Sequence, residues 1–374
     1  MGSELHEIIK LIDLFGIYFV VVPYLANRFG HYFRIKKIYN HKKIIKVSVP
    51  PKYKKKYDNI ELNKINNKTF KEVALEFSKV LIEHFPEEAL TNFYNNLNEL
   101  TIKNNKLIVL IGAGGCYAPL NNSITISDFD AIYHELFHMA SRLYSKSDGV
   151  SYVGFKQRST KLSKITYNGI GTGLNEGYTE VLTHRYFRSK TYSSYEFETD
   201  IARKLETIIG ADKMTDLYLK GDLSGLINEL KKYMPEDEII KFITRIDLIN
   251  EYEIEHKSII VRESIFDIYE FLLKANALKL KMQYDEGLID ISTFKTLSND
   301  YLDSFKTVVY LPSIKYELRN IEEMYNIILK DINAPGYIEN HFNSKWYLWI
   351  WLKVGNVLEY YLPFLIRSLL NWQI

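Results

Sequence analysis

The chain has 374 residues, enough for two or three domains with buried cores. Its 48 lysine and arginine residues nearly balance 46 acidic residues, and the net charge of +2 excludes a protein whose whole surface is built to bind a polyanion. The single cysteine, Cys116, excludes an internal disulfide framework and suits a reducing compartment.

The first apolar run, residues 14–26, contains Gly16 and Pro23 and is shorter than the ~20 residues that a membrane-spanning helix needs. Acidic residues precede it, which is untypical of a secretory signal peptide. The sequence therefore predicts a cytoplasmic protein, or a secreted one if a leader has been removed.

Residues 28–57 carry eleven lysine or arginine residues and no acid. Two β-prone runs within this segment predict a basic hairpin. A solvated outer face is the favoured interpretation, and binding to an anionic membrane or an acidic partner is the alternative. The segment has no aromatic platform or motif for nucleic acid, so we expect no nucleic-acid partner and at most peripheral membrane attachment.

Two scaffold helices and two strands are expected next. Thr69 and Glu72 form a capping box for a helix that ends near His84, and Pro86 begins a second helix that ends near Leu100. Strands are predicted over residues 106–111 and 123–126, with a glycine-rich turn after the first.

The following helix contains the sequence Tyr-His-Glu-Leu-Phe-His-Met. His134 and His138 are four positions apart and therefore project from one face. Two neutral imidazoles can ligate zinc, and Glu135 beside them can take a proton from a water at the metal without being a ligand. The alternative is a pair of core histidines, but two of them flanking a glutamate would bury three polar groups with no evident partner. A cap-like start and an apolar stripe support the helix: Ser127 and Asp130, then Phe129, Ile132, Leu136, Met139 and Leu143.

A second glycine-rich turn, at residues 171–173, leads into a helix that ends near Phe187. Glu176 and Glu180 share one face of it, where Glu176 can be an anionic third ligand and Glu180 can hold the free N–H of a ligating histidine. A solvated helix face is the alternative for an isolated pair of glutamates. Gly177 destabilises a helix interior, which indicates that another helix or the metal approaches closely.

These two motifs resemble those of the gluzincins, the thermolysin-like group of zinc metallopeptidases, which have HExxH on one helix and Asn-Glu-x-x-x-Asp/Glu on the next. The resemblance covers residues 106–188. It implies one Zn²⁺ per chain, with Glu135 as the general base. A metzincin is excluded because Ser141 and Tyr144 stand where that group needs glycine and histidine. The residues that match are His134, His138 and Glu176 as ligands, Glu135 as base, and Glu180 and Asn175 beside the ligands.

The resemblance also implies that the strand before the active helix, over residues 122–126, edges the cleft and pairs with an extended substrate. Residues 150–155 and 164–167 are expected to form a hairpin over the site. Tyr152 or Tyr167 is a candidate oxyanion donor, as a tyrosine is in some gluzincins, although packing is favoured for either one among 29 tyrosines. His184 and His256 are weaker candidates for the same role.

We therefore expect an α+β fold, with a zincin-like catalytic core of mixed sheet and active-site helices and a mainly helical C-terminal domain. The expected divisions are an N-terminal region over 1–105, the core over 106–190 and the helical domain over 191–374. The four tryptophans in the last 29 residues are assigned to packed helices and not to a membrane anchor.

The expected function is hydrolysis of peptide bonds in a peptide or protein substrate. Residues 112–119 contain no acid that could anchor a free amine, which favours an endopeptidase. The alternatives are a non-catalytic peptide- or membrane-binding module that retains a structural zinc, and a metallohydrolase acting on a non-peptide bond. The sequence leaves the substrate and the oligomeric state open.

Overall fold

The structure is a computed structural model that describes residues 68–104, 115–126, 131–145, 150–159, 169–187, 195–252, 259–305 and 318–337. All of these residues up to Gly336 belong to one compact unit, His41–Gly336. The three-part division of the chain stays a prediction. The basic hairpin, the strand over 106–111, the cap at residues 127–130, Tyr167, His256 and the tryptophan-rich tail lie outside the described residues.

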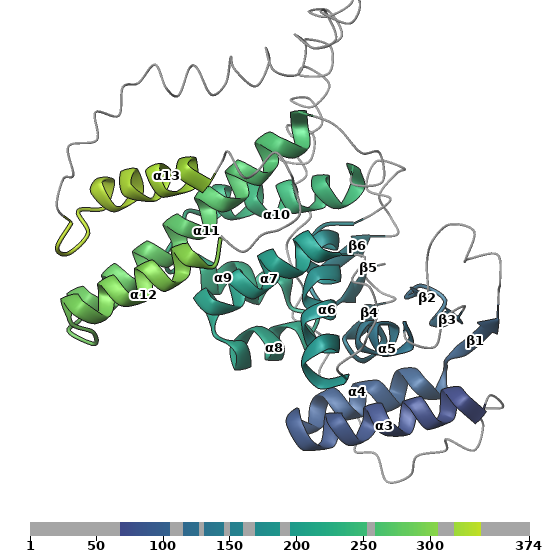
Figure 1. The fold of residues 1–374 in the computed structure, drawn as a ribbon. Coiled ribbons are helices and arrows are strands. Elements are labelled where there is room, and N and C mark those ends of the chain that lie inside the picture. Colours follow the sequence, from purple (N-terminus) through teal and green to yellow (C-terminus); the bar gives the residue numbers. More distant parts are fainter. Residues whose placement is uncertain are drawn as a thin grey trace, which may run out of the picture. The chain divides into compact units, whose positions relative to one another are not determined.

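The described part of the chain is α+β and mostly helical (Figure 1). The helices are α3 (Lys68–His84), α4 (Glu87–Asn98), α5 (Ile132–Ala140), α6 (Thr172–Phe187), α7 (Glu196–Ile209), α8 (Ala211–Leu219), α9 (Leu223–Leu230), α10 (Glu236–Tyr252), α11 (Ile259–Asp285), α12 (Ile291–Asp303) and α13 (Leu318–Asp331). The strands are β1 (Thr101–Asn104), β2 (Gly115–Ala118), β3 (Ser123–Ile126), β4 (Arg142–Ser145), β5 (Val150–Val153) and β6 (Lys156–Ser159).

The first sheet is mixed, with strand order β1-β3-β2. β3 is parallel to β1, with Ile102 opposite Ile124, and antiparallel to β2, with Tyr117 opposite Ile124. β3 is therefore the central strand, and the expectation that residues 122–126 edge the cleft is wrong, because both sides of β3 are already paired. The sequence did not reveal this because β2 begins at the end of the predicted glycine-rich turn, where we expected no strand.

The second sheet is antiparallel, with strand order β4-β5-β6. β5 was expected, but its predicted partner over residues 164–167 is wrong, since β4 and β6 occupy its two sides. A two-residue turn joins β5 to β6, and Gly154 adopts a positive φ of 53° there, which glycine tolerates well. Helix α5 is also shorter than expected: it ends at Ala140, and Leu143 belongs to β4.

The predicted scaffold helices α3 and α4 fix the position of α5, against which both pack (Figure 1). Asn96 of α4 donates from Nδ2 to the carbonyl oxygen of Met139 at 2.9 Å, and Asn92 donates to that of Ala140. These side chains satisfy carbonyl groups that the end of a helix leaves without partners. The ring of Phe77 packs edge-on against Phe137, with centroids 4.8 Å apart.

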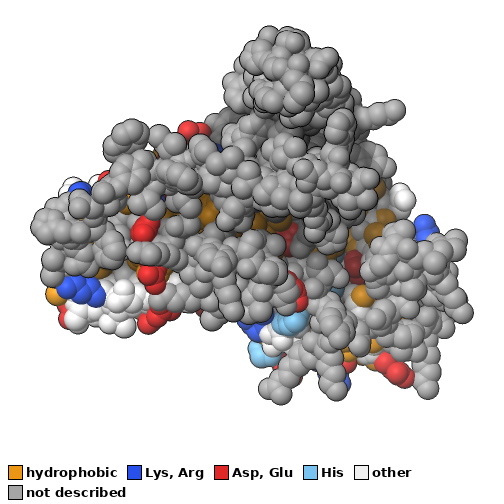
Figure 2. Space-filling view, turned by 45° about the horizontal axis from the view of Figure 1, so that its top comes forward, with side chains coloured by type: hydrophobic (Ala, Val, Ile, Leu, Met, Phe, Trp, Pro, Cys, Tyr) orange, Lys and Arg blue, Asp and Glu red, His pale blue; other side chains and the backbone are white. Residues whose placement is uncertain are grey.

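Of the helices from α7 onward, α7 and α10 pack on α6, and α12 and α13 pack on α11. Helix α7 lies along α6, and α10 contacts both α6 and α11. Gly221, Pro235 and Gly287 lie between successive helices. Among the described helices, none combines the length and the apolar character needed to cross a bilayer. On the described part of the face drawn in Figure 2, acidic and basic side chains are interspersed.

Candidate metal centre

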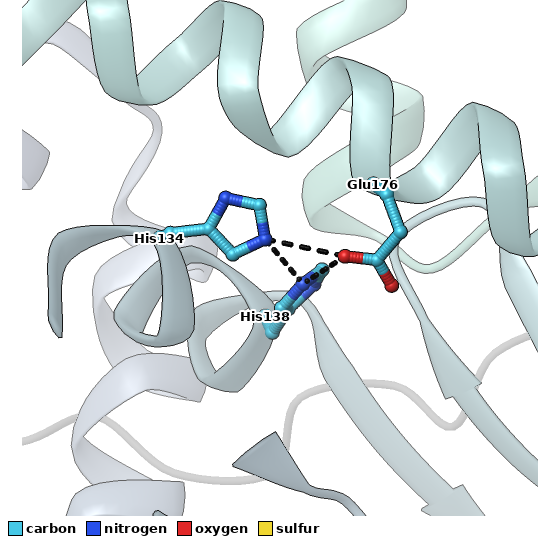
Figure 3. A group of neighbouring side chains, drawn as sticks. All are labelled: His134, His138 and Glu176. Atoms are coloured by element: carbon cyan, nitrogen blue, oxygen red, sulfur yellow. Dashed lines mark hydrogen bonds and ion pairs between the residues drawn. The ribbon is translucent and has the colours of Figure 1, made fainter. Parts of the chain in front are cut away.

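Three ligand atoms converge between α5 and α6 (Figure 3). His134 Nε2 and His138 Nε2 are 3.0 Å apart, and Glu176 Oε2 lies 3.2 Å from the first and 3.0 Å from the second. A tetrahedral zinc with bonds of about 2.0–2.1 Å separates its ligand atoms by about 3.3 Å. The three side chains therefore fit one zinc ion in both chemistry and spacing.

The structure brings together the three ligands that the sequence predicted. The two histidines lie one helical turn apart on α5, and α6 presents Glu176 across from them. His138 is buried, while His134 and Glu176 are nearly so, with side chains 11% and 13% exposed. Within the described residues, this is the one group of three or more potential ligand side chains that could hold a metal ion.

The charges of the triad indicate that it holds a proton when no metal is bound. Burial lowers the pKa of His134, but hydrogen bonds to Glu176 and Glu180 outweigh burial and raise that pKa to about 10. Burial acts to raise the pKa of Glu176, yet the neighbouring His138 and His134 hold it well below its ordinary value. If the triad holds a metal, an imidazolium and a carboxylate at this spacing would be its proton-loaded form.

Glu180 uses both carboxylate oxygens. Its Oε2 lies 2.8 Å from Nδ1 of His134, as expected for a residue that orients a ligand histidine, and its Oε1 lies 2.9 Å from Nε2 of His184. His184 therefore contacts the far oxygen of Glu180, on the side away from His134. These contacts link His134, Glu180 and His184 in a row from the triad toward the surface, where the side chain of His184 is 32% exposed.

Asn175 and Thr179 of α6 lie beside the second potential ligand, His138. Asn175 Nδ2 is 3.2 Å from His138 Nδ1, and Thr179 Oγ1 is 3.3 Å from the same nitrogen. The sequence pointed to Asn175 but not to Thr179, although Thr179 is one helical turn after Asn175 and must share its face. Both residues are buried, with 1% and 0% exposure.

Glu135 lies next to the triad without belonging to it. It is buried, its carboxylate accepts a hydrogen bond from the backbone N–H of Tyr117 in β2, and a Cβ at Gly115 would come within 3.0 Å of its Cγ. Burial raises the pKa of Glu135, and the nearby His134 and His138 oppose that shift. A carboxylate with a raised pKa beside a metal site is suited to exchange a proton.

Tyr195 is a site residue that the sequence did not indicate. It directly precedes α7, and its ring stacks on that of His134 with centroids 5.9 Å apart. The charge of Glu176, then burial and the charge of Glu135, raise the pKa of Tyr195, so its hydroxyl keeps its proton near both carboxylates. No local signal marks Tyr195, because it reaches the site through the packing of α7 on α6.

Two of the expected oxyanion donors are among the described residues: His184, which contacts Glu180, and Tyr152, which lies in β5. Tyr152 is buried in β5, paired with Leu143 of β4 and Gln157 of β6. Tyr167 and His256 are outside the described residues.

Asp247 of α10 holds the start of α6. Its carboxylate oxygens accept hydrogen bonds from the backbone N–H groups of Gly171 at 2.8 Å and Gly173 at 3.0 Å. Burial raises the pKa of Asp247 to about 7, although these N–H groups favour its charged form. Asp247 thus fixes the helix that carries Glu176 and is a half-buried group whose pKa lies near neutral pH.

Comparison of the chain with protein-family models, with curated proteins and with solved structures finds no match to any of them.

Proposed function

We propose that the chain is a zinc-dependent peptidase of the gluzincin type, with a zincin-like core. The observation that carries this proposal is the position of Glu135: it is buried beside the three potential ligands, on the same helix as two of them, but is not part of their cluster. A site that only stabilises a fold has no use for a base in that position.

Each residue has a distinct role in the proposed reaction. Zinc, held by His134, His138 and Glu176, would supply Lewis acidity, which makes a water acidic and polarises the peptide carbonyl. Glu135 takes the proton of the attacking water and passes it to the leaving amine. The hydroxyl of Tyr195 donates a hydrogen bond to the carbonyl oxygen as negative charge develops on it.

The substrate is proposed to bind along β2. Among the described strands, β2 pairs on one side only, with β3, and its Tyr117 N–H points to Glu135. An extended peptide can add to such an edge through main-chain hydrogen bonds. This mode of binding needs no free terminus, and β2 itself, Gly115–Ala118, contains no acid to anchor an amine. Both points favour an endopeptidase.

Two alternatives remain distinct from this proposal. A non-catalytic module with a structural zinc would bind metal and hydrolyse nothing. A metallohydrolase for another bond would need Glu135 and zinc equally, but would act on esters or amides that are not peptides. Hydrolysis of peptides therefore separates the proposal from both alternatives, and hydrolysis of non-peptide esters or amides separates the two alternatives from each other.

The first test combines metal analysis with peptide hydrolysis. Purified protein is expected to hold one zinc per chain and to cleave internally quenched peptides whose two ends are blocked. A chelator should abolish cleavage and added zinc should restore it. The Glu176→Ala protein should lose the zinc, and full zinc content in that variant would contradict the ligand assignment. Release of single residues from free ends alone would contradict the endopeptidase.

A further inference from the structure

The second ligand histidine, His138, requires a hydrogen-bond acceptor that its neighbour Asn175 does not provide. His138 faces the other two ligands with Nε2, so its Nδ1 carries the proton in the neutral ring. The Asn175 atom that lies 3.2 Å from His138 Nδ1 is the amide nitrogen Nδ2, which is itself a donor.

The orientation of the Asn175 amide is fixed from the other side. Its Oδ1 accepts the backbone N–H of Phe155 at 3.1 Å. Turning the amide over would offer oxygen to His138 but would place an NH₂ group against the N–H of Phe155. The buried N–H of Phe155 would then face another donor, which is unfavourable.

Thr179 can complete the hydrogen bonds between Asn175, His138 and Tyr218. Its Oγ1 donates to the carbonyl oxygen of Asn175 at 2.7 Å, which leaves two lone pairs free. One can accept Nδ1–H of His138 at 3.3 Å and the other can accept the hydroxyl of Tyr218 at 2.5 Å. Tyr218 is completely buried, and burial raises its pKa, so this hydroxyl stays a donor.

We propose that Thr179, held in place by Tyr218, is the positioning residue that sets the tautomer and ring orientation of His138. This inference rests on the metal centre of the proposed function. The two ligand histidines are then held differently: a carboxylate, Glu180, holds His134, while a neutral hydroxyl holds His138. The neutral partner adds no second negative charge behind the ligands.

The test removes the hydroxyl with little change of shape. Thr179→Val should weaken zinc binding by about 10–100-fold, as loss of a partner to a ligand histidine does in other sites, whereas Thr179→Ser should stay close to wild type. The matched control is Thr183→Val, one turn further along α6. Its hydroxyl is as buried as that of Thr179 and, among the described residues, bonds only to the carbonyl oxygen of Thr179. Zinc affinity is measured by competition with a chromophoric chelator, and the visible spectrum of the Co²⁺-loaded proteins reports the geometry of the centre.

The expected result is a weaker and spectrally altered centre in Thr179→Val, with Thr179→Ser and Thr183→Val unchanged. Equal zinc affinity and an unchanged Co²⁺ spectrum in Thr179→Val would overturn the proposal, and so would equal losses in Thr179→Val and Thr183→Val. If the valine protein does not fold, Thr179→Ala removes the same hydroxyl and is held to the same outcomes. Failure of the wild-type protein to bind zinc would instead overturn the proposed function.

Discussion

Gly177 lies directly against the backbone carbonyl of Glu198, so closely that a Cβ on Gly177 would overlap that oxygen. Gly177 is in α6, one residue after the proposed ligand Glu176, and Glu198 is in the first turn of α7. Gly177 therefore allows α7 to pack on α6, and this packing brings Tyr195 over His134. The expected close approach at Gly177 is confirmed, and the approaching element is α7.

Gly177→Ala should consequently destabilise the protein, although alanine normally stabilises a helix by about 1 kcal/mol relative to glycine. The added methyl group must displace a backbone carbonyl, and overpacking of this kind costs about 1–3 kcal/mol. Chemical denaturation of the metal-free proteins measures the free energy of unfolding. A Gly177→Ala protein as stable as wild type, or more stable, would contradict the packing of α7 on α6.

Tyr195→Phe should lower kcat by about 10²-fold with little change in zinc content, because one hydrogen bond to the developing oxyanion is lost. Tyr152→Phe is the control, since that side chain is buried in β5. Steady-state kinetics on a quenched peptide separate kcat from KM. If Tyr152→Phe lost the activity and Tyr195→Phe kept it, Tyr152 would be the donor instead.

Zinc binding at pH 8 should release about one proton per ion, because the pKa of about 10 for His134 means that the metal-free triad is protonated there. Isothermal titration calorimetry in buffers of different ionisation enthalpy gives the number of protons released. For the same reason zinc affinity should increase as the pH rises from 6 to 9. Binding with no proton release at pH 8 would show that the triad is not charged as described.

Asp247→Asn should change how stability depends on pH. The pKa of Asp247 is about 7 in the folded protein and near 3.8 in an unfolded chain, so its contribution is most favourable below pH 4 and is lost as the pH rises toward 7. Asparagine has no such dependence. The free energy of unfolding of Asp247→Asn, relative to wild type, should therefore rise between pH 4 and pH 7 and level off above, measured without metal. A difference that is constant or falls over this range would contradict the assignment.

Helical periodicity explains which parts of the site the sequence could predict. Residues four apart on one helix share a face whatever surrounds them, so His134 with His138, and Glu176 with Glu180, could be paired from their spacing alone. Glu180 was expected to hold one of the two histidines, and the structure shows that this histidine is His134, with the two side chains 2.8 Å apart.

The missed features depend on contacts between distant segments. Whether β3 or β2 is the outer strand depends on pairing partners, which the apolar pattern of a four-residue strand does not specify. Tyr195 reaches the site only because α7 packs on Gly177. Thr179 could have been placed on the correct face, but its role follows from the orientation of Asn175, which the backbone of Phe155 determines.

The central claim is that Glu135 is the base of a zinc-dependent peptidase, and the Glu135→Gln protein tests it most directly. Glutamine keeps the size of the side chain but does not take up a proton, so turnover of a quenched peptide should fall by about 10²–10⁴-fold or more. Zinc content, measured on the same sample, should stay at one ion per chain, because Glu135 is not a ligand. Undiminished hydrolysis by zinc-loaded Glu135→Gln, in a preparation free of other proteases, would contradict the account.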